Sequence, residues 1–225
     1  MASGVYDIAD GFRRVDEYPS GGIGPHEMIL LADGKTIAVA NGGILTHPDF
    51  PRQKLNLASM SPSLSYIDLD SGRIEETVSL ADAFHQVSIR HICSSGDQVW
   101  WAGQYEGAAT DDVPLVGYHR RGEPMTTVDL GPDVTPRLRH YVGSIAANAA
   151  NTQVAITSPR GGCLVTIDTA TDNVHDVSAI RDVCGVAPRM PGYMVSAGTG
   201  AIALGPNDEP AATYHVAWDN HLYRV

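Results

Sequence analysis

Short apolar runs separated by polar turns recur along the chain. One β-prone segment recurs four times. A shorter apolar run precedes each copy, and a hairpin-like segment with a polar tip follows it. The pattern therefore predicts units of four short strands joined by tight turns. The repeated segments share a polar turn followed by a β-prone run that ends in a small residue: ADGKTIAVANGG (32–43), SGDQVWWAGQ (95–104), AANTQVAITSPRGG (149–162) and MPGYMVSAGTG (190–200).

Turn chemistry supports the same units. The hairpin tips DSG, RRG and GPND contain residues that favour tight turns. The extra length of the first unit lies in the loop 46–63, and no sustained helical period interrupts the series. Such a series predicts an all-β fold, a β-propeller of four-stranded blades, with a β-sandwich as the alternative.

The two ends of the chain predict strands outside the complete units. GVYDIADGFRRVDEYPS at the start matches the outer hairpin of a blade, and WDNHLYRV at the end resembles an inner strand. Either the C-terminal strand joins the hairpin in a composite blade, or the chain lacks upstream blades and exposes an open edge that favours self-association. We expect one β-propeller domain over residues 1–225, with about four full blades and an incomplete or composite one.

Composition limits the classes of partner. The 225 residues carry 26 acidic and 15 basic side chains, for a formal charge of −11, which repels the phosphates of nucleic acids. The three cysteines form no CxxC pair, and no apolar run is long enough for a membrane helix. No signal peptide is visible, which predicts a cytoplasmic protein or a truncated chain.

Several motifs together resemble a known family. GIGPHEMILLADGKTIAVANGGILTHPD, SIRH, GQYEG, TSPRGG, CGVA and WDNHL follow one another over nearly the whole chain. In this they resemble the bacterial family called domain of unknown function 1513, of which the chain looks like the C-terminal two-thirds. The resemblance implies a seven-bladed propeller, twin-arginine export to the periplasm, and genes beside imelysin-like iron-uptake lipoproteins and di-haem peroxidases. No activity is established for the family, so no catalytic residue is carried over.

Histidines stand at similar places in three predicted inner strands. His26 lies in GPHEMIL, His91 in SIRHICS and His221 in WDNHLYRV, each before an apolar pair. Because the inner strands of a propeller converge on a central channel, we align these three side chains and expect them to meet there. Imidazole suits Fe, Cu and Zn, so the pattern predicts a transition-metal site on the axis. The alternative is a water-filled channel with histidines bonded to backbone carbonyls.

Other polar residues fall near the same channel. We expect Glu27, Arg90, Ser144 and Cys184 to line it, and Arg160 to lie at the end of a strand in TSPRGG. The guanidinium of Arg90 repels a bound cation unless it faces away from the channel or pairs with Glu27. Arg90 is also suited to binding an anionic ligand.

The loop THPDFPRQK contains His47 and Asp49. Long loops between strands often carry function, so both residues are candidates for ligand binding. The alternative is a loop packed by its own prolines, which stiffen a chain without any ligand.

Two functions from different classes follow. The first is a non-enzymatic or redox-accessory propeller that binds Fe, Cu or Zn on its axis and serves iron or metal uptake. The second is a metal-free interaction scaffold that docks an imelysin-like or cytochrome-like partner through the loops 44–63 and 103–114. A propeller hydrolase or lactonase is the weaker alternative, because the sequence identifies no nucleophile with its base.

Overall fold

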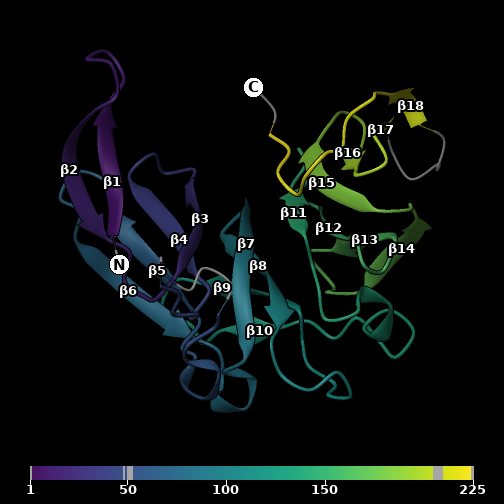
Figure 1. Ribbon diagram of the computed structural model, residues 1–225, viewed down its shortest axis with the longest axis horizontal. Helices are drawn as coiled ribbons and strands as arrows, with labels where there is room; N and C mark the ends of the chain where they lie inside the picture. Colours follow the sequence, from purple (N-terminus) through teal and green to yellow (C-terminus); the bar gives the residue numbers. More distant parts are fainter. Residues whose placement is uncertain (1, 48, 50–52, 205–209, 224–225) are drawn as a thin grey trace.

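The protein is a β-propeller arranged as an open arc. A computed structural model describes residues 2–47, 49, 53–204 and 210–223. Four antiparallel sheets of four strands each and one sheet of two strands stand side by side around a common inner side (Figure 1). The prediction of an all-β propeller with four full blades and an incomplete one is therefore confirmed.

The strands of each complete blade follow one another in chain order from the inner side outward. The predicted repeats account for every one of these blades, although the tip GPND lies outside the described residues. Blade by blade, the strands are β3 (Pro25–Leu30), β4 (Thr36–Asn41), β5 (Ser63–Asp68) and β6 (Ile74–Ser79); β7 (Val87–Ser95), β8 (Gln98–Tyr105), β9 (Val116–Arg120) and β10 (Thr126–Thr127); β11 (Ser144–Ala147), β12 (Gln153–Ser158), β13 (Cys163–Asp168) and β14 (Val174–Ala179); β15 (Val183–Pro188), β16 (Tyr193–Ala197), β17 (Ala201–Leu204) and β18 (Pro210–Thr213).

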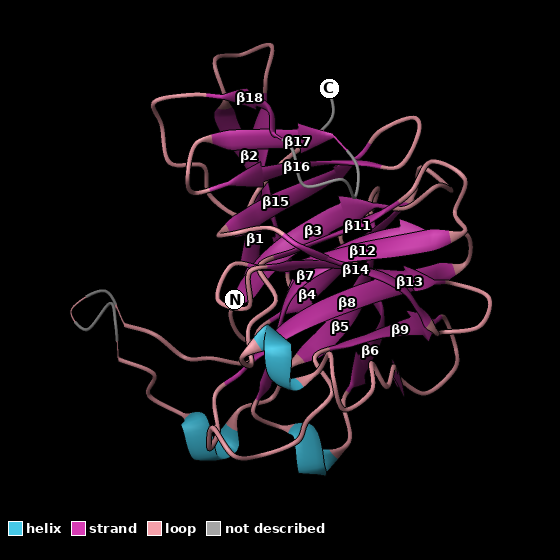
Figure 2. Cartoon of the chain, turned by 90° about the vertical axis from the view of Figure 1, so that its right-hand side faces the viewer, coloured by secondary structure: helices cyan, strands magenta, loops and turns pink. Residues whose placement is uncertain are grey.

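Helical structure among the described residues is limited to three single turns. They lie among the loops on one side of the molecule (Figure 2) and are η1 (Leu57–Ser59), η2 (Asp82–Phe84) and η3 (Pro136–Leu138).

The start of the chain forms the outer hairpin that its sequence predicts. Strands β1 (Ala2–Asp7) and β2 (Arg13–Pro19) pair with a bulge between Val5 and Tyr6. Three of the four complete blades carry a similar irregularity in the outer hairpin, for example between Tyr66 and Ile67 in β5 and β6. The Tyr18 hydroxyl donates to the carbonyl oxygen of Leu69 (3.0 Å), which ties the hairpin to the first complete blade.

The prediction of an inner strand at WDNHLYRV is wrong. Residues 218–223 form no strand, and β1 and β2 remain a sheet of two strands, so the described C-terminal residues build no composite blade. Asp219 and Asn220 explain the difference, because their side chains bond locally and across the arc instead of permitting a ladder. Asp219 Oδ1 accepts from the Asn220 backbone (2.7 Å), and Asn220 Nδ2 donates to the Tyr141 hydroxyl (3.0 Å).

The core lies within and between the stacked blades. Trp100 and Trp101 of β8 are fully buried, as is Leu64 of β5. This packing leaves the inner edges of β3, β7, β11 and β15 facing the hollow of the arc, where the polar residues of interest gather.

Candidate metal centre

Two bulges in neighbouring inner strands aim side chains into the hollow. In β3 the register shifts between Pro25 and Glu27, and in β7 it shifts between Ile89 and His91. The extra residue at such a bulge is unpaired and the following side chain is re-aimed, which is a common device beside functional sites. Because β3 and β7 lie side by side, Glu27 and His91 come to face each other.

This register corrects the alignment of the inner strands. We aligned His26 with His91 from the sequence, but the bulges make His26 equivalent to Arg90 and Glu27 equivalent to His91. The physical reason is that a bulge adds one residue without changing the apolar pattern on either side.

Hydrogen bonds fix both oxygens of the Glu27 carboxylate. His91 Nδ1 donates to Glu27 Oε2 at 3.3 Å, and the backbone N–H of Ile92 donates to the same oxygen at 2.9 Å. The Tyr223 hydroxyl donates to Glu27 Oε1. His91 is buried and Glu27 is half-buried, so this cluster is shielded on the protein side.

Glu27 is a carboxylate at neutral pH. Burial opposes its ionisation, but the hydrogen bonds from His91, Tyr223 and Ile92 outweigh that cost and hold the pKa of Glu27 below its ordinary value. Burial, followed by the hydrogen bond to Glu27, raises the pKa of Tyr223, which therefore stays a phenol and a donor. The cluster thus presents a negative charge to the hollow.

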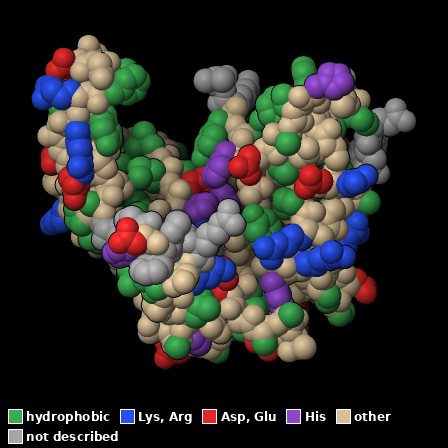
Figure 3. Space-filling view, in the orientation of Figure 1, with side chains coloured by type: hydrophobic (Ala, Val, Ile, Leu, Met, Phe, Trp, Pro, Cys, Tyr) green, Lys and Arg blue, Asp and Glu red, His purple; other side chains and the backbone are tan. Residues whose placement is uncertain are grey.

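The C-terminal segment brings the third donor. Its residue His221 lies against the inner strands, and its ring centroid is 5.1 Å from that of His91. One ligand atom each from Glu27, His91 and His221 lies within 4.8 Å of the other two. His221 is exposed, so the group opens toward solvent, and Figure 3 shows histidine and acidic side chains gathered in the hollow of the arc.

The donor set suits a transition metal. Bonds of about 2.0–2.2 Å to a tetrahedral ion place the ligand atoms roughly 3.4 Å apart, so the widest pair must draw together by a little over 1 Å. His221 stands on a segment without regular structure, which permits such a movement. Two imidazoles and one carboxylate are the ligands of open non-haem iron and of zinc sites, where other coordination positions stay free.

His26 lies beside this group but outside it. Its ring centroid is 4.9 Å from that of His91 and 6.3 Å from that of His221. Burial, with His91 and Arg90 as further causes, lowers the pKa of His26 to about 4, so the ring is neutral at physiological pH. The three predicted histidines therefore gather in one place, with Glu27 in the position expected of His26.

Arg90 turns toward a different carboxylate. Its Nε donates to Ser88 Oγ at 2.9 Å, and one terminal nitrogen lies 3.7 Å from Glu106 Oε1. Glu106 also pairs with Lys54. The guanidinium is thus balanced by Glu106 and not by Glu27.

The other three residues expected near the channel lie in different places. The Ser144 hydroxyl accepts from the Val186 backbone at 3.3 Å and lines the pocket beside the donors. Cys184 is buried and its thiol donates to the Asp182 carbonyl oxygen at 3.2 Å. Arg160 is exposed and its guanidinium covers the Tyr141 ring at 4.4 Å. Of these three, the structure brings only Ser144 to the candidate centre.

The loop candidates stand apart from the centre. His47 and Asp49 are exposed, and the Asp49 backbone donates to His47 Nδ1 at 3.2 Å. Residues 48 and 50–52 of the same loop lie outside the described part of the chain. The contact between His47 and Asp49 is therefore a local one, of the kind found in a turn.

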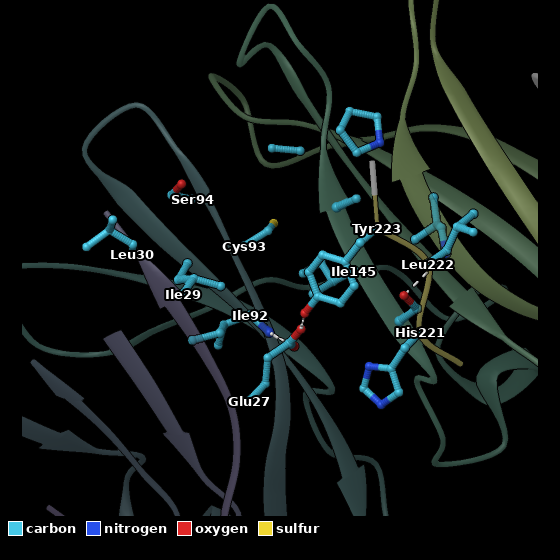
Figure 4. A pocket seen from close by; sticks show the side chains of 15 residues that line it. Glu27, Ile29, Leu30, Ile92, Cys93, Ser94, Ile145, His221, Leu222 and Tyr223 are labelled. Carbon is cyan, nitrogen blue, oxygen red and sulfur yellow. Dashed lines mark hydrogen bonds between the residues drawn. The ribbon is translucent and has the colours of Figure 1, made fainter. Parts of the chain in front are cut away.

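A pocket of about 340 Å³ lies beside the donors, and Figure 4 shows it with Glu27, His221 and Tyr223 together along one side. Sequence reasoning missed Tyr223 and the apolar lining. Tyr223 had a detectable signal, since residues two apart in an extended segment share a side, and His221 was already a candidate.

These observations define the class of protein, a β-propeller with a candidate metal centre on its inner side. The chain belongs to the family described as Protein of unknown function (DUF1513), whose family model matches residues 2–225. A comparison with curated proteins gave no match. None of the helices in the described residues is long and apolar enough to cross a membrane.

Solved structures resemble the chain in fold. The β-propeller domain of Myceliophteria thermophila Cps50 (Swd1) is similar with a TM-score of 0.61 at 12% identity, over 89% of this chain and 57% of that one. Hydrazine synthase of Kuenenia stuttgartiensis is similar with a TM-score of 0.53 at 16% identity, over 74% of this chain and 46% of that one. The chain thus spans about half the length of these structures.

Proposed function

We propose that this protein binds one transition-metal ion through Glu27, His91 and His221 and serves in the handling of iron or a related metal. The observation that carries the proposal is the convergence of three donor atoms within 4.8 Å. The donors come from two blades and from the C-terminal segment, so no local sequence constraint explains their meeting.

The electrostatics of the cluster support a cation. A carboxylate whose pKa is held below its ordinary value stands beside the imidazoles of His91 and His221. Neutral imidazoles and an ionised carboxylate are the states in which these groups ligate metals. An ion between Glu27 and His91 would replace the hydrogen bond that joins them, and the neutral imidazole would keep its one proton on the ring nitrogen that faces away from the ion.

The ligand types favour Fe²⁺ and Zn²⁺ over harder cations. Calcium and magnesium prefer oxygen ligands, whereas two imidazoles with one carboxylate suit iron and zinc. With Glu27 ionised, a divalent ion at this centre keeps a net charge of +1 and free coordination positions. The centre can therefore hold a metal reversibly and present it to a further ligand.

The test is calorimetric titration of the metal-free protein with Zn²⁺ and, without oxygen, with Fe²⁺. We expect one metal-binding site. His91→Ala should weaken metal binding at least about tenfold, because even the loss of a group that only supports a metal ligand has an effect of that size. His175→Ala is the matched control, because His175 is an exposed histidine on β14. Equal affinity in His91→Ala and the unmodified protein would refute the proposal and leave an interaction scaffold as the alternative.

A further inference from the structure

The pocket beside the metal donors is lined by ten apolar and five polar side chains. Its volume of about 340 Å³ is at the lower end of the range for small-molecule sites and too small for a folded segment of another protein. Glu27, His221 and Tyr223 lie together on one side of it (Figure 4), and Ser94 and Ser144 are the other polar residues of the lining. The apolar walls include Ile29, Ile92, Ile145, Val186 and Leu222.

Charge decides which ligand fits. Neither lysine nor arginine is among the described residues that line the pocket, and the carboxyl group of Glu27 is among them. An anionic ligand is therefore repelled unless a metal is bound. A divalent ion with Glu27 leaves a net charge of +1 at the end of an apolar cavity, and a monoanion would neutralise it. Pairing opposite charges is the way in which apolar surroundings tolerate ions.

We infer that the pocket is a subsite for a small monocarboxylate with an apolar body, bound together with the metal. This inference rests on the proposed function. The carboxylate would complete the coordination of the ion, and the apolar body would lie against the walls formed by β7, β11 and the C-terminal segment. Metal and ligand are thus coupled, and each raises the affinity of the other by the same factor.

The experiment uses the Co²⁺-loaded protein, with benzoate and acetate as probes. Metal affinity is measured first, then the change of the Co²⁺ absorption spectrum during titration with each carboxylate. We expect benzoate to bind at least tenfold more tightly than acetate, because its ring buries apolar surface. The metal-free protein should bind neither, and saturating benzoate should lower the Kd for Co²⁺.

A pocket-filling variant separates the subsite from the metal centre. Ala147 lines the pocket at the end of β11, and Ala147→Phe should abolish the preference for benzoate with the Co²⁺ affinity unchanged. Ala149→Phe is the matched control, since Ala149 is exposed in the following turn. Leu30→Trp, at an exposed position of the lining, provides a second filling variant if Ala147→Phe does not fold.

The outcomes distinguish the two proposals. Metal binding without any effect of benzoate overturns the subsite and leaves the metal centre intact. Benzoate binding without metal, or equal affinity for benzoate and acetate, also overturns the subsite. Absence of metal binding overturns the metal centre, and the subsite with it.

Discussion

At the residue scale, the candidate centre depends on which side chain follows a bulge. His26 and Arg90 are the extra residues in β3 and β7, and Glu27 and His91 follow them. The carboxylate is held by donors on both oxygens before any metal arrives, so little rearrangement of Glu27 is required. The imidazole of His221 stands on a segment without regular structure and would have to make the larger movement.

Replacing Glu27 tests this assignment directly. Glu27→Gln keeps the size of the side chain but removes its charge and one acceptor. We expect the affinity for Zn²⁺ to fall at least about tenfold, since supporting groups alone contribute that much. His26→Gln is the matched control on the same strand and should change the Zn²⁺ Kd much less. If the two variants lose affinity equally, His26 belongs among the ligands.

The sequence predicted part of this centre. The alignment of three predicted inner strands led us to expect His26, His91 and His221 to meet, and their rings do lie together, although His26 is equivalent to Arg90 and His221 lies on no strand. The choice of Glu27 over His26 was not predictable, because a bulge changes the register without changing the apolar pattern. Tyr223 was missed because its partner, Glu27, is distant in sequence and lies in the first complete blade, whereas Tyr223 lies in no blade.

At the element scale, the C-terminal segment, residues 218–223, covers one side of the centre and is called the strap here. It is fixed by Asn220 on Tyr141 and by Leu222 against β15, where Gly185 leaves the necessary space. A Cβ at Gly185 would lie 2.8 Å from Leu222 Cβ and 3.1 Å from the Leu222 backbone nitrogen. The segment was predicted as a strand because its apolar pair resembles those of the repeats, but Asp219 and Asn220 satisfy their own hydrogen bonds.

Gly185→Ala should therefore weaken metal binding from a distance. The added methyl group displaces Leu222 and with it His221, so we expect a higher Kd for Zn²⁺ with the blade still folded. The check is a double-mutant cycle by calorimetry. In a His221→Ala background, Gly185→Ala should add no further loss. An equal loss in both backgrounds would show that Gly185 acts on the blade and not on the strap.

The tight turns of the blades make a separate, pH-dependent contribution. Asp33, between β3 and β4, accepts from the Lys35 and Thr36 backbone at 2.8 and 2.9 Å and from the Thr36 hydroxyl at 2.7 Å. The hydrogen bonds from Lys35 and Thr36 lower the pKa of Asp33 from 3.8 to about 2. The carboxylate therefore stabilises the folded state above pH 3.8, and this contribution is lost as the pH falls toward 2.

We expect Asp33→Ala to lower the Tm at pH 7 and to lower it less at pH 3. Scanning calorimetry of both proteins at the two pH values is the measurement. Asp70→Ala, an exposed aspartate at the tip of the next turn, is the control and should leave the Tm unchanged. A larger effect of Asp33→Ala at pH 3 than at pH 7 would be inconsistent with a depressed pKa.

At the scale of the whole molecule, neighbouring blades are joined by buried polar contacts as well as by apolar packing. The Tyr66 hydroxyl of the first complete blade donates to His119 Nδ1 of the second at 2.7 Å, and both residues are fully buried. His119 Nε2 in turn lies 2.7 Å from the Glu123 carbonyl oxygen. The repeats predicted the order of the blades, but they contain no sign of this pair, because the two side chains belong to different repeats.

Tyr66→Phe should lower the free energy of unfolding by about 1–3 kcal/mol, because it leaves a buried ring nitrogen of His119 without a donor. Urea denaturation gives this value. Tyr6→Phe is the control, since the Tyr6 side chain is 53% exposed, and it should change the free energy by less than about 0.5 kcal/mol. Zn²⁺ affinity should be the same in both variants. A smaller loss for Tyr66→Phe than for Tyr6→Phe would exclude the inter-blade bond as a stabilising contact.

A metal held by Glu27, His91 and His221 should be visible by anomalous diffraction from crystals grown with Zn²⁺ or Fe²⁺. We expect one strong anomalous peak on the inner side of the arc, about 2.0–2.2 Å from a ring nitrogen of His91, from a ring nitrogen of His221 and from a Glu27 oxygen. No peak at these residues under saturating metal, or a peak bound only by other histidines, would contradict it.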